Sequence, residues 1–336
     1  MCRVAILGAT GLVGRTMLAL LEERGFPVER PRLLASDRSP SRTLRFRGAE
    51  LPVEPVTREA FDGIDLALFA STNSVSEEWA PLARAAGARV IDNSSAYRYH
   101  PDVPLVVPEI NARELESRPT LIANPNCSTI AIVLPLAALL GAARLERLIV
   151  STYQSVSGAG SDALDDLERG VREGLDGTPV ARANGLAPFA FNVVPHIDRF
   201  EDNGYTREEM KIVWETRKIL GYPALPVTAT AVRVPVRVGH SVAVWASFDR
   251  PLDPDAARTL WRAFPGIEVI DDPTLNAYPT PLAVAGRDPV IVGRARRDLA
   301  DPNGLTFFVA SDNLRKGAAL NAVQIAEVLC RHSVIA

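Results

Sequence analysis

The chain has 336 residues, 47% of them hydrophobic and 23% charged, which is enough for two globular domains with substantial cores. Its formal net charge of -3, with arginines scattered among acids, offers no basic surface for nucleic acid, and no apolar run reaches the ~20 residues of a membrane span. Three cysteines, Cys2, Cys127 and Cys330, are too few for a disulfide framework and too widely spaced for a metal site. We therefore expect a cytoplasmic protein without a metal, a nucleic-acid partner or a membrane partner.

A glycine-rich turn follows the first apolar run, residues 4–7, and precedes a helical pattern over residues 15–24. A strand, a glycine turn and a helix in this order bring backbone N–H groups close to a pyrophosphate. The pattern predicts a dinucleotide site rather than a bare turn. Its expected residues are Gly8, Thr10, Gly11, Leu12, Val13 and Gly14.

The next predicted strand, residues 32–36, leads to the place where the adenosine ribose would lie. An acid there accepts a hydrogen bond from the 2′-hydroxyl of NAD, whereas an arginine with hydroxyl neighbours holds the 2′-phosphate of NADP. Ser36, Arg38 and Ser39 form such an anion site and favour NADP, although Asp37 favours NAD. A plain surface turn is the remaining interpretation.

Further strands are predicted at residues 66–70, 90–92 and 120–123, with a helix over 75–86 between the first two. Strands that alternate with helices predict a Rossmann-type, doubly wound parallel sheet. Ligands of such sheets bind at the carboxyl ends of the strands. Because Cys127 follows the last of these strands, we expect its thiol to face the same cleft as the glycine turn.

Cys127 stands at the start of a predicted helix, after Asn124-Pro125-Asn126 and before a long apolar run over residues 130–143. Free N–H groups at a helix start favour a thiolate and can hold an oxyanion. The pattern indicates a nucleophile, against the alternative that the side chain fills the core. We expect Pro135 to kink this helix without reaching its start.

The second half of the chain is rich in β-prone runs, at residues 148–153, 229–234, 241–246 and 306–310. They predict an α+β domain with one open, mixed and mostly antiparallel sheet, covered on one side by helices over 207–220 and 254–264. A helical pattern over 314–331 returns to the first domain. We therefore predict an NADP-binding domain of residues 1–131 plus 313–336, and a catalytic and dimerisation domain of residues 132–312.

Five polar residues of this second domain are candidates for chemistry with Cys127. Gln154 ends a strand, so its amide can orient a substrate, and His240, after Gly239, can shuttle protons with an ordinary pKa near ~6.5. Arg233 and Glu208 can hold a carboxylate and an ammonium, and Lys211 lies on the same helical face as Glu208. The alternatives are a structural histidine and a solvated helix surface.

Taken in order, these segments resemble those of bacterial aspartate-semialdehyde dehydrogenases. The resemblance covers nearly the whole chain. It is carried by residues 8–14, 92–95 with Arg98, 106–111, 124–129, Gln154 with Ser157 and Gly158, 208–211, 233–236 with 239–241, and 311–314 with 316–318.

The resemblance implies reversible conversion of L-aspartate 4-semialdehyde, phosphate and NADP to L-4-aspartyl phosphate and NADPH, at the entry to lysine, methionine and threonine biosynthesis. It implies that Cys127 is the nucleophile, His240 the general acid/base, and Gln154 the residue that orients the thioacyl intermediate. The remaining implied contacts are Arg233 with the substrate carboxylate, Glu208 with its amino group, Arg98, Asn126 and Lys211 with phosphate, and Ser157, Gly158 and Asn313 with the cofactor.

One departure from the family pattern lies at residues 70–74, which read Ala-Ser-Thr-Asn-Ser where the family has serine, alanine, two glycines and serine. The bulkier side chains stand against a close approach of the cofactor there.

Two rival functions remain. One is another phosphorylating semialdehyde dehydrogenase such as N-acetyl-glutamyl-phosphate reductase, which would have no free ammonium for Glu208 to bind. The other is a nonenzymatic nucleotide-binding paralogue, which would have no reason to keep Cys127, Gln154, Arg233 and His240 together. The open sheet and the resemblance both favour a homodimer or a dimer of dimers.

Overall fold

The structure is a computed structural model that describes residues 1–36, 42–181 and 187–331. The chain forms two compact units: Met1–Asn126 with Ala318–Ala336, and Cys127–Gly317. The second unit is thus one continuous stretch of sequence, inserted between the two parts of the first.

The first unit is built on a seven-stranded sheet in the order β3-β4-β2-β1-β5-β6-β7. Neighbouring strands are parallel, except in the β3–β4 hairpin, which the sequence did not predict. The winding reverses between β1 and β5, so the predicted Rossmann-type, doubly wound sheet is confirmed. The strands are β1 (Val4–Leu7), β2 (Arg32–Ala35), β3 (Thr43–Phe46), β4 (Ala49–Pro55), β5 (Leu66–Phe69), β6 (Arg89–Asp92) and β7 (Leu121–Ala123).

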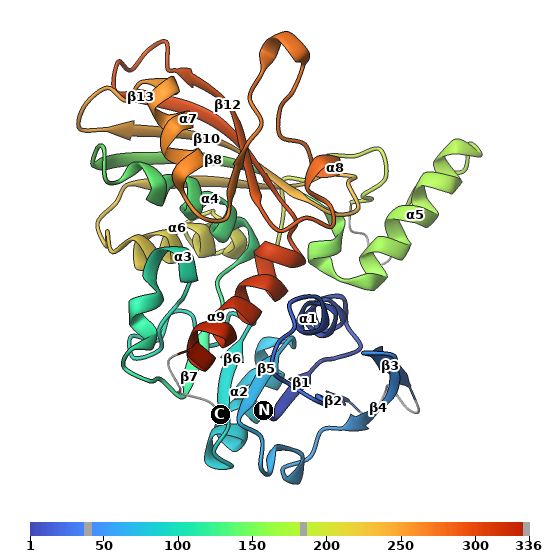
Figure 1. Cartoon of the computed structure of the whole chain (residues 1–336). Coiled ribbons are helices and arrows are strands. Elements are labelled where there is room, and N and C mark those ends of the chain that lie inside the picture. The colour runs from blue at the N-terminus through green and yellow to red at the C-terminus, as the bar shows by residue number, and fades with distance from the viewer. Residues whose placement is uncertain (37–41, 182–186, 332–336) are drawn as a thin grey trace. The chain divides into compact units, whose positions relative to one another are not determined.

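Helices cover both faces of this sheet. α1 (Leu12–Glu23) and α9 (Leu320–Arg331) pack together on one face, and α2 (Asn73–Ala85) lies on the other (Figure 1). Ile6, Leu20 and Val323 are fully buried where α1 and α9 meet the strands. Burial on both faces is the physical reason that β1, β5 and β6 read as unbroken apolar runs. Short helices η1 (Glu59–Phe61), α3 (Pro108–Asn111) and η2 (Ala112–Leu115) complete the unit.

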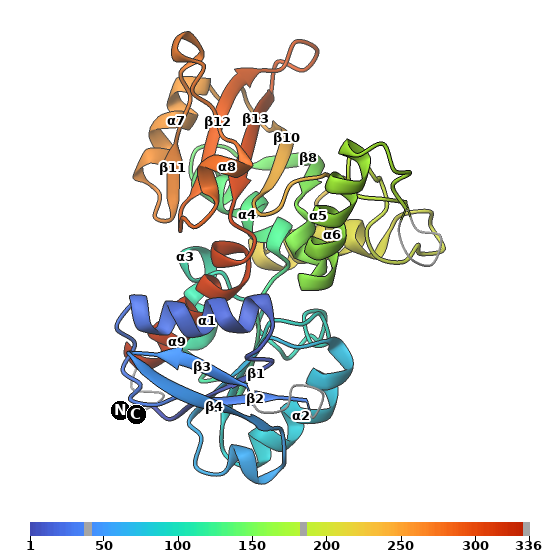
Figure 2. The same cartoon turned by 90° about the vertical axis from the view of Figure 1, so that its right-hand side faces the viewer.

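The second unit holds a six-stranded mixed sheet in the order β11-β12-β13-β10-β8-β9 (Figure 2). The three central pairings are antiparallel and the two outer pairings are parallel, as predicted for an α+β domain. The strands are β8 (Leu145–Gln154), β9 (Val227–Arg233), β10 (His240–Phe248), β11 (Ile267–Val269), β12 (Val290–Arg297) and β13 (Gly304–Ser311).

Three helices pack on one face of this sheet: α4 (Cys127–Leu139), α6 (Arg207–Leu220) and α7 (Pro254–Ala263). The apolar run after Cys127 was expected to stay helical to residue 143, but α4 ends at Leu139 and a turn follows it. Pro135 lies inside α4, and its carbonyl accepts a hydrogen bond from the indole N–H of the buried Trp261 at 3.0 Å. None of the described helices is long and apolar enough to cross a membrane.

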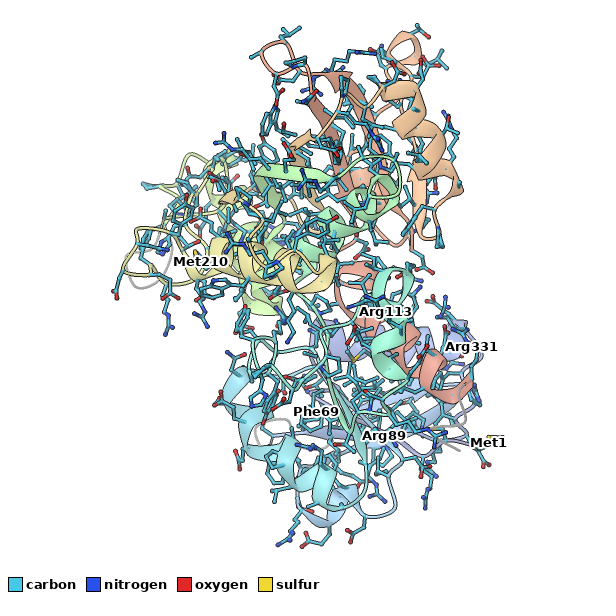
Figure 3. The ribbon with its side chains drawn as sticks, turned by 90° about the vertical axis from the view of Figure 1, so that its left-hand side faces the viewer. Met1, Phe69, Arg89, Arg113, Met210 and Arg331 are labelled. Carbon is cyan, nitrogen blue, oxygen red and sulfur yellow. The ribbon has the colours of Figure 1, made fainter. Side chains whose placement is uncertain are left out.

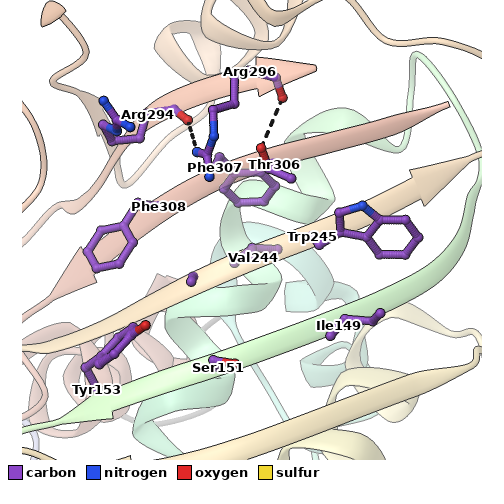
Figure 4. Close-up of a pocket in the computed structure, with 11 residues that line it drawn as sticks. Ile149, Ser151, Tyr153, Val244, Trp245, Arg294, Arg296, Thr306, Phe307 and Phe308 are labelled. Atoms are coloured by element: carbon purple, nitrogen blue, oxygen red, sulfur yellow. Dashed lines mark hydrogen bonds between the residues drawn. The ribbon is translucent and has the colours of Figure 1, made fainter. Parts of the chain in front are cut away.

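The opposite face of the sheet carries side chains that are only partly covered. Tyr153, Trp245 and Phe308 project from β8, β10 and β13 into a shallow hollow of about 420 Å³ (Figure 4). The tyrosine is 39% exposed, and its ring lies 6.0 Å from that of Phe308. This aromatic face is the exposed side of strands whose alternate residues, such as Val150, are buried under the helices.

The other elements of the second unit are η3 (Val156–Ala159), α5 (Ser161–Leu175), η5 (Pro273–Leu275), α8 (Pro281–Val284) and the π-helical turn η6 (Arg315–Ala319), whose last two residues belong to the first unit.

Candidate active site

The glycine turn of the first unit has the geometry that a dinucleotide requires. Gly8 has a φ of +85°, and a Cβ there would lie 2.3 Å from the carbonyl oxygen of Ala70. A Cβ on Gly14 would lie 2.2 Å from the Gly8 carbonyl oxygen, so only glycine lets α1 pack this closely on the turn. Gly11 is the N-cap of α1 and has no side chain to occupy the first N–H groups. Thr10, Leu12 and Val13, which flank it, are partly exposed.

The predicted ribose site is described only in part. Ser36 follows β2 and is exposed, whereas Arg38 and Ser39 lie outside the described residues, as does Asp37. The choice between NAD and NADP therefore stays a prediction from sequence.

Residues 70–74, where the sequence departs from the pattern that the resemblance implies, connect the end of β5 to the first residues of α2. Thr72 is the N-cap of this helix with an extended backbone, φ −76°, which needs no glycine. The Asn73 side chain exchanges hydrogen bonds with Ser95 at 2.9 Å. The segment is therefore a tight polar connection between the ends of β5 and β6.

Arg98 and Asn126 lie in the first unit, and both are buried to 6% exposure. The guanidinium of Arg98 donates to the carbonyl oxygen of Asn93, after β6, at 2.7 Å and to that of Asn124, after β7, at 2.8 Å. The cation is therefore fixed at the carboxyl ends of two parallel strands, the edge at which such sheets bind ligands.

Cys127 is the first residue of α4 and is half-buried. The chain approaches it closely at Gly317, where a Cβ would lie 2.9 Å from the Cβ of Cys127. Gly317 belongs to the π-helical turn η6, a distortion that is often found at functional sites. The helix begun by Cys127 packs against β10 and α6, the two elements that carry His240 and Glu208.

Three of the predicted residues lie at one edge of the mixed sheet. Gln154 ends β8 and is paired in register with Arg233, which ends the parallel strand β9. His240 begins the antiparallel strand β10 and is paired with Ser311 at the end of β13. Gln154, Arg233 and His240 are 1%, 6% and 1% exposed, so these polar groups are withheld from water.

Gln154 is linked to α6 by hydrogen bonds. Its Nε2 donates to Glu208 Oε1 at 3.2 Å, and Lys211 Nζ lies 3.2 Å from Glu208 Oε2. Lys211 also pairs with Asp198 at 2.7 Å. Burial raises the pKa of Asp198, but the bonds from Lys211 and from the backbone of Arg199 lower it below its ordinary value. Lys211 therefore lies on the same helical face as Glu208, as predicted, and its ammonium joins the buried Glu208 to the exposed Asp198.

The start of α6 is fixed by a capping box. Thr206 Oγ1 accepts the Glu209 N–H at 3.3 Å, and the Glu209 carboxylate accepts the Thr206 N–H at 2.7 Å. Such a cap contributes about 1 kcal/mol. The other oxygen of Glu209 accepts the N–H of Ala231 in β9 at 2.9 Å. These bonds fix how α6 is rotated about its own axis, and therefore which way Glu208 and Lys211 point.

His240 is held by the turn that follows β8. Its Nδ1 accepts the backbone N–H of Ser155 at 3.0 Å, and the Ser155 hydroxyl lies 3.0 Å from the same nitrogen. Burial lowers the pKa of His240 well below its ordinary value, and the positive charge of Arg233 lowers it further. The ring is therefore neutral near pH 7.

Gly158 leaves a space between His240 and Arg233. A Cβ at this position would lie 3.1 Å from Arg233 Nη1 and 3.2 Å from His240 Nε2. Arg233 is itself anchored by a 2.7 Å bond from Nη1 to the Ser155 carbonyl oxygen. A small polar ligand in this space would meet a guanidinium and an imidazole N–H together.

Asn313 joins the turn after β8 to the start of β10. Its Oδ1 accepts from the Ser155 hydroxyl at 3.0 Å, the Ser157 hydroxyl at 3.2 Å and the Gly239 N–H at 2.9 Å. Asn313, Ser157 and Gly158, all predicted to contact the cofactor, thus lie in one network with His240.

Sequence reasoning missed two residues of the site: Ser155, which contacts His240, and Asp198, which pairs with Lys211. Ser155 is one of several serines in the turn after β8, so the sequence gives no signal that sets it apart. Asp198 precedes Lys211 by 13 residues, outside any helical spacing, and the structure alone brings them together.

Family comparisons agree with this arrangement. Residues 3–118 match the model described as semialdehyde dehydrogenase, NAD binding domain, and residues 136–316 match semialdehyde dehydrogenase, dimerisation domain. The chain is 48% identical to the aspartate-semialdehyde dehydrogenase of Aquifex aeolicus, over 99% of both proteins. The chain belongs to the aspartate-semialdehyde dehydrogenase family.

Solved structures of the family share the fold. The crystal structure of aspartate semialdehyde dehydrogenase II from Vibrio cholerae complexed with ASA has a TM-score of 0.95 and 45% identity, covering 98% of each chain. The Candida albicans enzyme with NADP has a TM-score of 0.78 and 26% identity, covering 100% of each chain. The chain therefore contains both domains of the family.

Proposed function

We propose that this protein catalyses the reversible, phosphate-dependent oxidation of L-aspartate 4-semialdehyde to L-4-aspartyl phosphate, with NADP as the electron acceptor, in the cytoplasm. In the biosynthetic direction this reaction leads to lysine, methionine and threonine. The observation that carries the proposal is the buried edge of the mixed sheet that holds Gln154, Arg233 and His240, where Gln154 donates a hydrogen bond to Glu208 of α6. The identity of the proposed substrate comes from membership of the aspartate-semialdehyde dehydrogenase family.

The glycine turn fits a nicotinamide dinucleotide. The positive φ of Gly8 and the missing side chains of Gly11 and Gly14 leave the N-terminal N–H groups of α1 accessible to a pyrophosphate. We assign Ser36, Arg38 and Ser39 to the 2′-phosphate of NADP, a choice supported by the NADP in the Candida albicans relative. Such a cofactor, when bound, supplies the two-electron acceptor for the oxidation.

Cys127 is the proposed nucleophile. Its thiolate attacks the aldehyde carbon and forms a hemithioacetal, which after oxidation is a thioester on the same sulfur. Phosphate then attacks the thioester carbon, L-4-aspartyl phosphate departs, and the thiolate is regenerated. The first-turn N–H groups of α4 favour the thiolate on which both attacks depend.

The charged groups select the substrate. Arg233 is fixed by Ser155 and matches a carboxylate, and the buried carboxylate of Glu208 matches a free ammonium. An N-acetylated substrate has no such ammonium, so Glu208 favours aspartate semialdehyde over N-acetyl-glutamate semialdehyde. Arg98, Asn126 and Lys211 are assigned to phosphate.

His240 and Gln154 are proposed to bind and orient the tetrahedral adduct on Cys127. Because Nδ1 accepts from Ser155, the neutral ring carries its proton on Nε2, and this N–H donates to the oxygen on which charge develops. To act as the general acid/base, His240 must first take a second proton on Nδ1, where the Ser155 hydroxyl lies at 3.0 Å. The imidazolium then gives its Nε2 proton to the adduct oxygen and takes it back when that oxygen becomes the thioester carbonyl. The Gln154 amide, held by Glu208, orients the thioacyl group.

The aromatic face of the mixed sheet is the proposed contact between two copies of the chain. Tyr153, Trp245 and Phe308 present exposed apolar area that a twofold-related copy would cover, and the matched family domain is described as a dimerisation domain. We propose a homodimer, which two such dimers can extend to a dimer of dimers.

The test is NADPH formation from L-aspartate 4-semialdehyde with phosphate present or omitted, by the native protein and by Cys127→Ala. We expect turnover that requires phosphate and is lost in the variant. Without phosphate, the native protein should accumulate one acyl group on Cys127, visible as a mass increase. Turnover with NAD but not with NADP would contradict the proposed cofactor. A preference for N-acetyl-L-glutamate 5-semialdehyde would contradict the proposed substrate.

A further inference from the structure

A chain of buried amide groups runs through the first unit. Asn124 follows β7 and Asn321 lies in the first turn of α9, and both residues are fully buried. The Asn321 side chain donates to the carbonyl oxygen of Val106 at 2.8 Å and to Asn124 Oδ1 at 2.7 Å. The Asn124 side chain donates in turn to the carbonyl oxygen of Ala318 at 3.1 Å and to Asn93 Oδ1 at 2.6 Å. Three asparagines far apart in the sequence are therefore joined end to end.

The chain begins where α9 packs against the short helices α3 and η2. Figure 3 shows these helices beside α9, with Arg113 labelled in η2 and Arg331 labelled at the end of α9. Val106 lies just before α3, so the Asn321 side chain reaches it across this contact.

Backbone carbonyl groups fix which way each amide points. A carbonyl oxygen can only accept, so Val106 requires the amide nitrogen of Asn321, and Ala318 requires that of Asn124. The second N–H of each amide is then directed at the next asparagine. A rotated amide would set its oxygen against a carbonyl oxygen, which is costly in a buried site.

The far end of the chain holds Arg98. Its guanidinium donates to the backbone carbonyl oxygens of Asn93 and Asn124, at 2.7 and 2.8 Å. The side chains of the same two asparagines are bonded to each other. The three residues thus form a closed ring, in which both carbonyl groups that hold one edge of the guanidinium are fixed. Because a guanidinium is planar, a fixed edge determines where its opposite edge points.

Packing alone would not require an amide in this part of α9. The neighbours of Asn321 in the sequence, Leu320, Ala322 and Val323, all belong to the buried apolar core. A leucine has nearly the same shape as asparagine and brings no polar group that must be satisfied, whereas a buried amide is unfavourable unless it is fully bonded. Buried polar networks of this kind hold one particular arrangement.

We propose that Asn124 and Asn321 are positioning residues for phosphate, and that they act through Arg98. The inference rests on the proposed function, in which Arg98 binds the phosphate that attacks the thioester. Both N–H groups of each amide are bonded within the protein, so neither amide has an N–H left to donate to the anion. Their effect on phosphate is therefore exerted through the direction in which the guanidinium points.

The test compares Asn321→Leu with Asn111→Leu. Asn111 is the matched control because its amide also bonds the segment around Val106, at 2.9 Å to the Leu105 carbonyl and 2.9 Å to the Val107 N–H. Within the described residues it has no hydrogen bond to the asparagine chain or to Arg98. Circular dichroism and thermal unfolding establish that both variants fold. Asn321→Ser, which is too short to reach Asn124 but is easily accommodated, serves as a second variant.

Two measurements are made on the full chain. Initial rates of NADPH formation give KM for phosphate and KM for L-aspartate 4-semialdehyde. Calorimetric titration with inorganic phosphate gives its Kd without turnover. We expect Asn321→Leu to raise KM and Kd for phosphate about tenfold, equivalent to about 1.4 kcal/mol, with KM for the semialdehyde nearly unchanged. Asn111→Leu should leave all three values as in the native chain.

A double variant tests whether the effect passes through Arg98. Arg98→Ala should weaken phosphate binding, and adding Asn321→Leu to it should weaken binding no further, because the route is already lost. A further loss in the double variant, or equal rises in both KM values, would show a general structural role and overturn the proposal. Native phosphate binding in Asn321→Leu would overturn it as well.

Failure of the proposed function gives different results. A native chain that binds phosphate but does not oxidise the semialdehyde would contradict the proposed reaction, while the titrations would still decide the role of Asn321. Phosphate binding that is unchanged by Arg98→Ala, or absent from the native chain, would contradict the assignment of Arg98 to phosphate and the inference with it.

Discussion

The backbone N–H of Ser155 donates a hydrogen bond to Nδ1 of His240 over 3.0 Å. A backbone N–H cannot accept, so Nδ1 must offer its lone pair and the neutral ring must carry its proton on Nε2. Turning the ring over would place a C–H against this donor. Among the described residues, the buried Nε2 has no hydrogen-bond partner. The resting protein therefore offers an N–H, not a lone pair, to the space beside Gly158.

The first prediction concerns this tautomer. Nitrogen NMR of protein labelled with ¹⁵N-histidine should show one ring with a protonated Nε2 and an unprotonated Nδ1 at pH 7, and its signals should vanish in His240→Asn. Ser155→Ala removes the hydroxyl but keeps the backbone donor, so the same tautomer should remain. An Nδ1-protonated ring in the native protein would contradict the hydrogen bond on which the assignment rests.

The second prediction follows from the lowered pKa of His240. Below the ordinary pKa of ~6.5 the unfolded chain binds a proton at this residue and the folded chain does not, so stability falls as the pH decreases. The slope from one such group reaches about 1.4 kcal/mol per pH unit. This dependence of stability on pH ends where the pH falls to the pKa of His240 in the folded protein.

Urea unfolding at several values between pH 7 and pH 5 measures this slope. His240→Asn serves as the comparison, because it keeps every other titrating group. The native chain should lose more stability across this range than the variant. Parallel curves would mean that the buried ring is not held neutral.

The third prediction tests the space left by Gly158. In Gly158→Ala the new Cβ would lie 3.1 Å from Arg233 and 3.2 Å from His240, so a substrate would compete with it for both groups. We expect kcat/KM to fall about tenfold or more, equivalent to about 1.4 kcal/mol, with little change in the thermal midpoint. Gly141→Ala is the matched control, since a Cβ there meets nothing within 4 Å. Equal activities of the two variants would remove Gly158 from the substrate space.

The fourth prediction concerns the aromatic face of the mixed sheet. Trp245→Glu places a carboxylate on this face, and burying it against a second copy would be costly. Sedimentation should show the native chain as a dimer or a larger even assembly, and the variant shifted towards monomer at micromolar concentration. Leu299→Glu, at a fully exposed residue, is the control and should assemble like the native chain. A native monomer would contradict the homodimer, and a Trp245→Glu variant that assembles normally would place the interface elsewhere.

Much of the fold could be predicted from the sequence because its signals are local. Continuous burial makes β1, β5 and β6 apolar runs, and the helices over 207–220 and 254–264 carry their own caps at Thr206 and Asp253. The strand β12 was missed for an equally local reason. Its register shifts between Gly293 and Arg296, where Arg294 has a φ of +57°, so the alternation that reveals a strand is broken.

The candidate site was predicted less completely. Cys127, Gln154 and His240 stand at the ends of elements beside turns, and such places can be recognised in a sequence. The contacts that set their chemistry join residues far apart in the chain, such as Ser155 with Asn313 and Lys211 with Asp198. No periodicity links such pairs, and only the folded strands bring them together.

The place of α9 in the first unit also constrains how the protein is made. This helix supplies Leu320, Val323 and Leu329 to the core around α1 and β1, yet it leaves the ribosome after the whole second unit. During synthesis the continuous second unit can fold as soon as residue 317 has emerged, while the nucleotide-binding sheet still lacks a buried layer. At that stage the first sheet exposes the apolar surface that α9 later covers. This partly folded first unit is therefore the intermediate that chaperones would bind.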